Sequence, residues 1–257
     1  FPLGSAAVLA EHSYELPHTA IFSSELLQDY FATIETGVFA VGPVEGRENS
    51  VAIRNAITPI GPVGAEELRH PGKKRLIFYA RPEEHAARNL FEIGTMALDK
   101  ALAGGHFSGW EICAIGNVDL GHGTLTLPES GVALTLIPRE TEARYAETLK
   151  SADVGLSLMG TPHPSLVPIE MASAGLVTVT NIFENKDEAA LTAISGNLLA
   201  ARRSVIDVAA ALVEAEIRSQ DLEARARNSE VDWPSSWGVA LDEEKMEAIE
   251  ALLETRP

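Results

Sequence analysis

The sequence has little of several features that mark particular protein classes. It holds one cysteine, Cys113, so no disulfide can form within the chain, and we expect this thiol to be a small core residue in a reducing compartment. No stretch reaches the ~18 consecutive apolar residues that a membrane helix needs. No basic, apolar leader opens the chain, although Phe1 is not a natural first residue and indicates a fragment or a processed end. We therefore predict a cytoplasmic protein with no integral membrane segment.

Positive charge is also scarce. The chain has 20 Lys and Arg against 37 Asp and Glu, which gives a formal net charge of −17. Nucleic-acid binding needs a basic face, so this balance argues against it. The dinucleotide-binding motif Gly-x-Gly-x-x-Gly and the Walker-type phosphate loop are absent. The seven histidines show no ligand spacing with acids or with the cysteine, so we predict no metal.

What is present is a regular alternation of apolar runs and helical patterns from residue 74 onward. We expect six strands, over residues 76–80, 111–115, 132–137, 154–158, 176–180 and 197–200, with helices over 83–102, 140–150, after Ser165 and over 204–218. Strands that are almost continuously apolar are typical of a parallel sheet covered on both faces. The predicted fold is therefore α/β, a doubly wound, Rossmann-like parallel sheet. Its ligand is expected beyond the carboxyl ends of the strands.

Glycine and proline set the predicted domain boundaries. They are dense in residues 42–73, which we interpret as a linker. Before it, residues 1–41 contain helix, strand and helix patterns (5–12, 18–22 and 24–33). After it we predict a nucleotide-binding domain over residues 74–230 and a terminal segment over 231–257 that ends in a helix, 242–253.

The loop from Thr161 to Ser165 falls between a strand and a helix start. Its sequence is Thr-Pro-His-Pro-Ser, and Glu170 follows one turn into the helix. The unpaired N–H groups and the dipole at a helix start favour an anion such as a diphosphate. Glu170 has apolar neighbours, so we expect it to be buried and therefore to need partners.

Two arginines complete the predicted site. Arg81 follows the first strand and Arg88 lies in the next helical turns, where guanidinium groups can grip phosphate oxygens. A carboxylate beside a diphosphate would more naturally accept from ribose hydroxyls. These residues together predict a nucleoside diphosphate site. The alternative is that both arginines are solvated surface charges and that His163 is a turn residue.

The segment Pro164–Val177 resembles the donor-site signature of GT-B glycosyltransferases, the retaining family that uses nucleotide sugars. The stretches Phe78-Tyr79-Ala80-Arg81-Pro82 and Arg88-Asn89-Leu90-Phe91-Glu92-Ile93-Gly94 resemble one branch, the rhamnosyltransferases of bacterial surface glycans. The resemblance covers roughly residues 74–240. It implies transfer of a sugar, rhamnose, from a dTDP- or UDP-sugar to a glycan acceptor. It also implies that no metal is required.

The resemblance also implies roles for single residues. Glu170 matches the glutamate that binds the donor ribose, and Arg81 and Arg88 match the Arg and Lys that hold the diphosphate. The loop residues Thr161, His163, Pro164 and Ser165 are implied to wrap the diphosphate and sugar, and Pro138 and Arg139 to cradle the base.

Two departures from the family pattern keep another class of function open. Pro162 stands where the first glutamate of the Glu-x7-Glu motif belongs. GT-B enzymes also have an N-terminal half that binds the acceptor, of which residues 1–41 look like a remnant. The alternative is a non-catalytic nucleotide-sugar-binding or assembly module. A sugar-nucleotide epimerase would need more acids and histidines in the cleft than we find.

Overall fold

The chain forms two compact units, which we describe from a computed structural model. The structure describes residues 13, 14, 16, 18–58, 60–69, 71–117 and 123–254. The larger unit is Ile57–Trp233, and the smaller combines residues 1–56 with residues 234–257. The helix predicted over residues 5–12 lies outside the described residues.

A seven-stranded sheet forms the centre of the larger unit, in the order β5-β6-β4-β3-β7-β8-β9. Its strands are β3 (Arg75–Tyr79), β4 (Glu111–Ile115), β5 (Gly123–Thr126), β6 (Ala133–Leu136), β7 (Val154–Leu156), β8 (Val177–Asn181) and β9 (Leu198–Ala201). All neighbours pair in parallel except β5, which is antiparallel to β6. The six parallel strands confirm the doubly wound sheet. The seventh was missed because β5 is exposed at the edge and has no apolar run.

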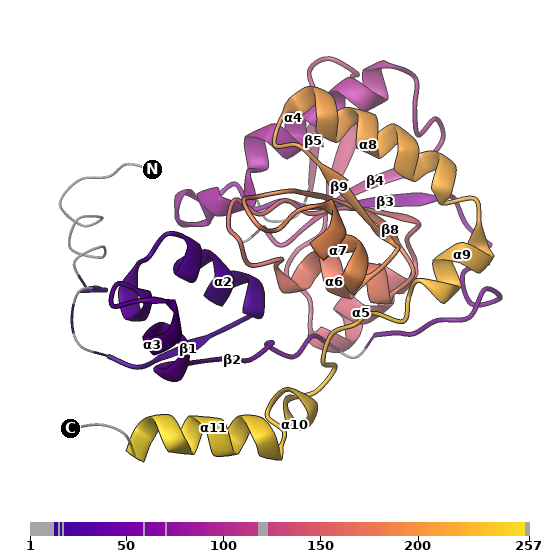
Figure 1. Ribbon diagram of the computed structural model, residues 1–257. Helices are drawn as coiled ribbons and strands as arrows, with labels where there is room; N and C mark the ends of the chain where they lie inside the picture. The colour runs from indigo at the N-terminus through magenta and orange to yellow at the C-terminus, as the bar shows by residue number, and fades with distance from the viewer. Residues whose placement is uncertain are drawn as a thin grey trace. The chain divides into compact units, whose positions relative to one another are not determined.

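Helices cover both faces of this sheet (Figure 1). The helices α4 (Phe91–Ala103) and α8 (Val205–Arg218) pack together over one face, and α5 (Glu142–Lys150) and α6 (Leu166–Ser173) cover the other. Along β3, Leu76 and Phe78 point to the first pair of helices, while Ile77 and Tyr79 point to the second. This alternation is the two-residue period of a strand buried on both faces. Two further helices, α7 (Glu188–Ile194) and α9 (Leu222–Arg227), complete the unit.

The helix predicted over residues 83–102 is two elements. A 3₁₀ helix, η2 (Glu84–Asn89), precedes α4, and Leu90 between them has a left-handed backbone with φ of 51°. The buried Asn89 side chain donates to the carbonyl of Ala86. Asparagine competes for backbone groups in this way and favours turns over continued helix, so the apolar periodicity alone gave the wrong start for α4.

The smaller unit is built on two short parallel strands. They are β1 (Ala20–Phe22) and β2 (Ser50–Ala52), joined through α2 (Glu25–Thr33), the 3₁₀ helix η1 (Gly37–Phe39) and α3 (Pro43–Glu48); α10 (Trp237–Ala240) and α11 (Glu243–Glu254) follow from the C-terminal segment. Phe22, Val38, Phe39 and Ala52 form its buried core.

Residues 42–73, expected to form a linker, instead contribute to both units. The first part forms α3 and β2, and the part from Ile57 onward belongs to the larger unit. The glycines and prolines there have packing roles: Gly42 and Pro43 begin α3, and Gly46 lies against the ring of Phe39, where a Cβ atom would be 2.2 Å from it. Composition alone does not separate such roles from flexibility.

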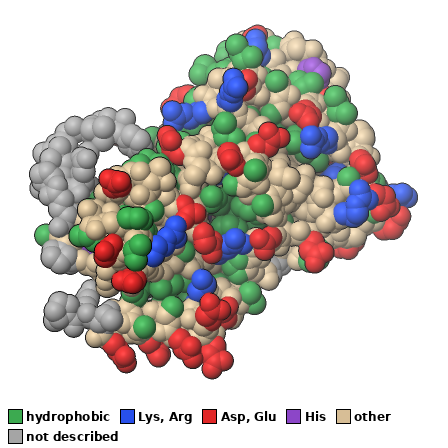
Figure 2. Space-filling view, viewed as in Figure 1, with side chains coloured by type: hydrophobic (Ala, Val, Ile, Leu, Met, Phe, Trp, Pro, Cys, Tyr) green, Lys and Arg blue, Asp and Glu red, His purple; other side chains and the backbone are tan. Residues whose placement is uncertain are grey.

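Acidic side chains form a row along α11, which carries Glu243, Glu244, Glu247, Glu250 and Glu254 on exposed positions (Figure 2). Such a row is a solvated helix face, in keeping with the acidic composition. Within the described part of the chain, no helix is long and apolar enough to cross a membrane.

Candidate functional site

The carboxyl ends of the parallel strands gather most of the residues singled out from the sequence. Arg81 follows β3, Pro138 and Arg139 follow β6, and the loop Thr161–Ser165 follows β7. The strand order changes direction at β3, because β4 and β6 lie on one side of it and β7 and β8 on the other. Ligands of doubly wound sheets bind at such a switch point. The structure therefore places the candidate residues where this fold holds its ligand.

The start of α6 has free backbone donors. Ser165 precedes the helix with φ of 71° and ψ of 149°, and its side chain makes no capping hydrogen bond. Its own N–H donates to Nδ1 of His163 at 3.0 Å. The N–H groups of Leu166 and Val167 donate to no partner among the described residues, and Pro168 has no N–H. An uncapped helix start with an open pair of donors is suited to an anion.

The backbone of Ser165 is strained. A residue with a side chain rarely adopts this positive φ with an extended ψ, a region that is essentially restricted to glycine. The two flanking prolines of the loop, Pro162 and Pro164, are buried, and His163 between them is half-buried with its ring edge-on to Trp233. Packing on both sides thus holds the strained residue at the helix start.

Arg81 is already engaged by protein groups. Its Nε donates to the carboxylate of Glu83 at 2.8 Å, and its terminal nitrogens lie 3.3 Å from the Tyr79 hydroxyl and 3.2 Å from Nε2 of His85. The hydrogen bonds that Arg81 donates to Glu83 and then to Tyr79 raise the pKa of Arg81, so it stays charged. Glu83 is buried, with its side chain 2% exposed. A phosphate would share this guanidinium with a carboxylate, which sequence spacing did not indicate.

Arg88 is the freer of the two arginines. Its side chain is exposed and makes no ion pair or hydrogen bond with any residue that the structure describes. Its backbone carbonyl accepts from the N–H of Gly160 at 2.7 Å. This bond places the end of η2 directly beside the root of the loop after β7, so the two segments predicted to hold a diphosphate are neighbours.

Glu170 is buried with partners, as its sequence environment predicted. It is 7% exposed. One carboxylate oxygen accepts from the N–H of Thr58 at 2.9 Å, and the other accepts from the Tyr145 hydroxyl at 2.7 Å. Each oxygen can accept a further hydrogen bond, so these partners orient the carboxylate and leave it able to receive a hydroxyl donor.

Glu170 and Arg81 each have a tyrosine as a hydrogen-bond partner. Burial, then the charge and hydrogen bond of Glu170, and finally nearby Tyr79 raise the pKa of Tyr145, so its phenol stays protonated and donates. Tyr79 in turn contacts Arg81, and its ring packs against Gly116 after β4. A Cβ atom on Gly116, which has φ of 86°, would lie 2.4 Å from that ring. Glu170 and Arg81 thus each share a hydrogen bond with a tyrosine, and the two tyrosines are near enough for Tyr79 to raise the pKa of Tyr145.

The residues expected to cradle a base are less defined. Pro138 is half-buried and Arg139 is exposed, and the Arg139 side chain has no partner among the described residues. Within that same set, no group of three or more His, Cys, Asp or Glu side chains is placed to hold a metal. The structure thus defines the surroundings of Arg81, the loop and Glu170 more closely than those of Pro138 and Arg139.

Sequence reasoning missed several contributors to this region. Thr58 reaches Glu170 from 112 residues away, and nothing in its local sequence predicts that contact. Tyr145 had a usable signal, since it is an aromatic residue in a mostly polar helix. Glu83, which accepts a hydrogen bond from Arg81, can be recognised in the sequence as an acid two residues later. Its burial cannot be recognised there.

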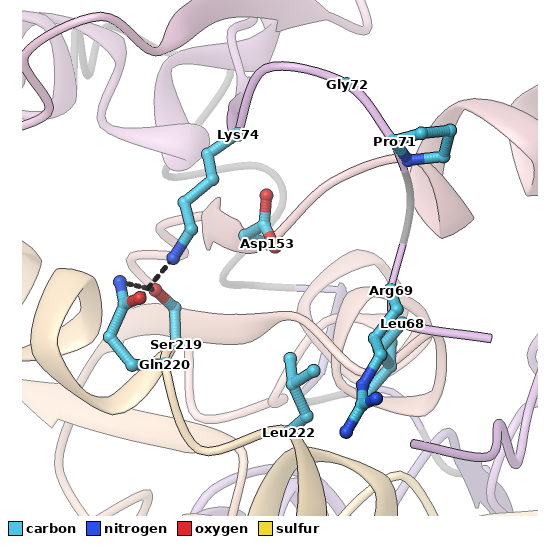
Figure 3. Close-up of a pocket in the computed structure, with 9 residues that line it drawn as sticks. All are labelled: Leu68, Arg69, Pro71, Gly72, Lys74, Asp153, Ser219, Gln220 and Leu222. Carbon is cyan, nitrogen blue, oxygen red and sulfur yellow. Dashed lines mark hydrogen bonds between the residues drawn. The ribbon is translucent and has the colours of Figure 1, made fainter. Parts of the chain in front are cut away.

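A separate hollow of about 380 Å³ lies at the amino ends of the strands, the opposite edge of the sheet (Figure 3). Lys74 reaches across it to Gln220, with Nζ 2.5 Å from the amide oxygen, and Asp153 lies at its wall. Asp153 is bound by the buried Arg225 at 2.9 Å. Because its charged groups already pair with protein groups, this hollow shows no counterpart of the arrangement around Glu170.

Comparison with known proteins identifies the family. A family model described as the C-terminal domain of WsaF matches residues 74–213, more than half of the chain. The chain belongs to the WsaF C-terminal domain family. The curated O-antigen biosynthesis protein RfbC of Myxococcus xanthus is 31% identical over 195 residues. That match spans 69% of this chain and only 12% of RfbC.

Solved structures of glycosyltransferases share the fold of this WsaF-type domain. A glycosyltransferase from Rickettsia africae has a TM-score of 0.62 at 10% identity, covering 100% of this chain and 69% of that one. Starch synthase IV of Arabidopsis thaliana has a TM-score of 0.60 at 11% identity, covering 95% and 58%. The WsaF-type fold is thus the C-terminal part of the GT-B architecture, as the sequence resemblance predicted.

Proposed function

We propose that this chain is the donor-binding part of a glycosyltransferase of glycan biosynthesis, and that it binds a nucleoside diphosphate sugar, with dTDP or UDP as the nucleotide and rhamnose as the sugar. The observation that carries the proposal is the pairing of an oriented, buried carboxylate on α6 with the uncapped start of the same helix. The curated relative RfbC is named for O-antigen biosynthesis, and the starch synthase is solved with ADP, a nucleoside diphosphate.

The proposed chemistry follows from charge. A diphosphate leaving group gains negative charge as the bond to the sugar breaks, and fixed donors stabilise that charge without reorganising. In our proposal the N–H groups of Leu166 and Val167 meet the phosphates together with Arg88 and the charge of Arg81. Glu170 accepts from the ribose hydroxyls and so sets the donor's position. A glycan acceptor would be bound by an N-terminal half for which β1 and β2 supply part of a parallel sheet.

Titration calorimetry with dTDP and UDP tests the proposal. Glu170→Ala and Arg81→Ala should each weaken binding by about tenfold or more, because each removes at least one charge-assisted hydrogen bond. Glu147→Ala and Arg144→Ala are matched controls, since both side chains are exposed on α5. Unchanged affinity in both site variants, with melting temperatures near wild type, would remove the donor-site assignment.

A second function has an observation in its favour. Pro162 replaces the first glutamate of the family motif, and Glu83 partly neutralises Arg81. Each of these two features would weaken the stabilisation of a departing diphosphate. Neither would remove the nucleotide site. A non-catalytic nucleotide-sugar-binding module is therefore the alternative. It predicts dTDP or UDP binding without sugar release when the dTDP- or UDP-sugar is incubated with the chain and acceptor glycan.

A further inference from the structure

Lys186 is buried without a negatively charged partner. It lies in the turn between β8 and α7 and is 0% exposed. Its Nζ donates to the carbonyl oxygen of Met159 at 2.9 Å, and no carboxylate pairs with it among the described residues. Lysine is almost never fully buried unless it is paired, because the ammonium loses its hydration. Burial lowers the pKa of Lys186 from 10.5 to about 7. A lysine that is so costly to bury suggests a role beyond filling the core.

Lys186 is one part of a clasp around Met159. The side chain of the buried Asn181 accepts from the Met159 N–H at 2.7 Å and donates to its carbonyl at 3.1 Å. Lys186 adds the second donor to the same carbonyl. The turn that carries Lys186 is itself fixed, because Phe183 and Lys186 exchange two backbone hydrogen bonds at 3.0 and 2.9 Å. Both sides of the clasp are therefore rigid.

The clasp holds the root of the loop that leads to α6. Met159 is followed by Gly160, whose N–H binds the carbonyl of Arg88, and then by Thr161–Ser165. The strained backbone of Ser165 needs such support from its surroundings.

We propose that Lys186 is a positioning residue, which binds the Met159 carbonyl and so holds the loop Thr161–Ser165 and the start of α6 in the conformation that receives the diphosphate. The second half of this inference, the effect on ligand binding, rests on the function proposed above. The first half, the ordering of the loop, concerns the free protein alone.

Amide hydrogen exchange of the full chain without ligand tests the first half. In Lys186→Met the side chain keeps its approximate length and loses its donors, so the hydrogen-bonded amides of Gly160 and Ser165 should exchange at least tenfold faster. The amides of β7 and β8 should keep their protection. Lys150→Met removes the same charge from an exposed position and should leave the loop unchanged. Wild-type protection of the loop in Lys186→Met would overturn the proposal.

Calorimetry with dTDP and UDP tests the second half. Lys186→Met should weaken binding about tenfold, and Lys150→Met should not. If wild type binds neither nucleotide, the proposed function fails while the exchange data still judge the role of Lys186. If wild type binds and Lys186→Met binds equally well, the positioning role fails alone. If Lys186→Met does not fold, both measurements are made on Lys186→Gln. The side-chain amide of this variant ends one bond short of the position of the Lys186 amine. Faster loop exchange then supports the proposal, and wild-type exchange contradicts it.

Discussion

Glu170 illustrates how much a single buried acid can organise. Its two oxygens take one hydrogen bond from the backbone of Thr58 and one from Tyr145, so three segments far apart in sequence meet at one carboxylate. A carboxyl group buried in such a place depends on the hydrogen bonds that its oxygens accept. Removing either donor should therefore be felt in the stability of the whole unit.

Tyr145→Phe tests this at the level of one hydroxyl. The change leaves a buried carboxylate oxygen without its donor, and we expect the free energy of unfolding to fall by about 1–3 kcal/mol. Urea denaturation followed by circular dichroism measures it. Tyr30→Phe is the matched control, because no hydrogen bond of the Tyr30 hydroxyl to another described residue is present. Equal stability of wild type and Tyr145→Phe would show that Glu170 does not depend on this bond.

Lys186 predicts a pH dependence of stability. Its pKa is about 7 in the folded state, below the 10.5 of the unfolded chain. Between these values the unfolded chain binds more protons, so the free energy of unfolding rises with pH; below pH 7 the burial penalty is constant and complete. We expect this rise, on the order of a few kcal/mol over the whole window, to be absent from Lys186→Met. Parallel pH profiles of the two proteins from pH 7 to 10 would contradict it.

At the scale of elements, the packing of α4 on β3 depends on one glycine. A Cβ atom on Gly94 would lie 2.7 Å from the ring of Phe78, which is fully buried. We expect Gly94→Ala to lower the free energy of unfolding by about 1–3 kcal/mol, because neither the ring nor the helix can move freely in a close-packed core. Thermal or urea denaturation measures the change.

Gly72→Ala provides the comparison for this substitution. Gly72 is exposed and has no atom within 4 Å of the added Cβ, so its stability should change by less than about 0.5 kcal/mol. A Gly94→Ala protein as stable as Gly72→Ala would mean that α4 can shift away from β3 without cost.

The sequence predicted most of these elements, for a physical reason. The six parallel strands are buried on both faces, so they appear as apolar runs, and α8 and α11 begin within one or two residues of their expected positions. The strands β2 and β5 and the helices α3, α7, α9 and α10 were not predicted. Of these, β5 is an exposed edge and α9 is short and polar. The break at Leu90 depends on a side-chain contact of Asn89 that periodicity does not register.

The candidate site was predicted in outline only. The positions of Arg81, the loop and Glu170 at one end of the sheet follow from strand order, which the sequence pattern implies. The ion pair of Arg81 with Glu83 and the contact of Thr58 with Glu170 depend on tertiary packing. Nucleotide binding by these residues stays a prediction, which the titration calorimetry with dTDP and UDP tests.

At the scale of the whole molecule, the larger unit contains everything that its fold needs. Its three core clusters, and every hydrogen bond described here for the Glu170 region, lie within Ile57–Trp233. We expect a fragment of residues 57–233 to unfold cooperatively in urea and to bind dTDP or UDP with the affinity of the full chain. A fragment without a cooperative transition would show that the division into two units does not reflect independent folding.

The smaller unit differs in this respect because its sheet has two strands. Each strand of β1 and β2 has an outer edge with no strand beside it among the described residues, and Ile21 on β1 is 55% exposed. Backbone groups along such an edge can pair with those of another copy of the chain. If this edge pairs with another copy in concentrated solution, replacing Ile21 with a charged residue should suppress the association, which light scattering measures.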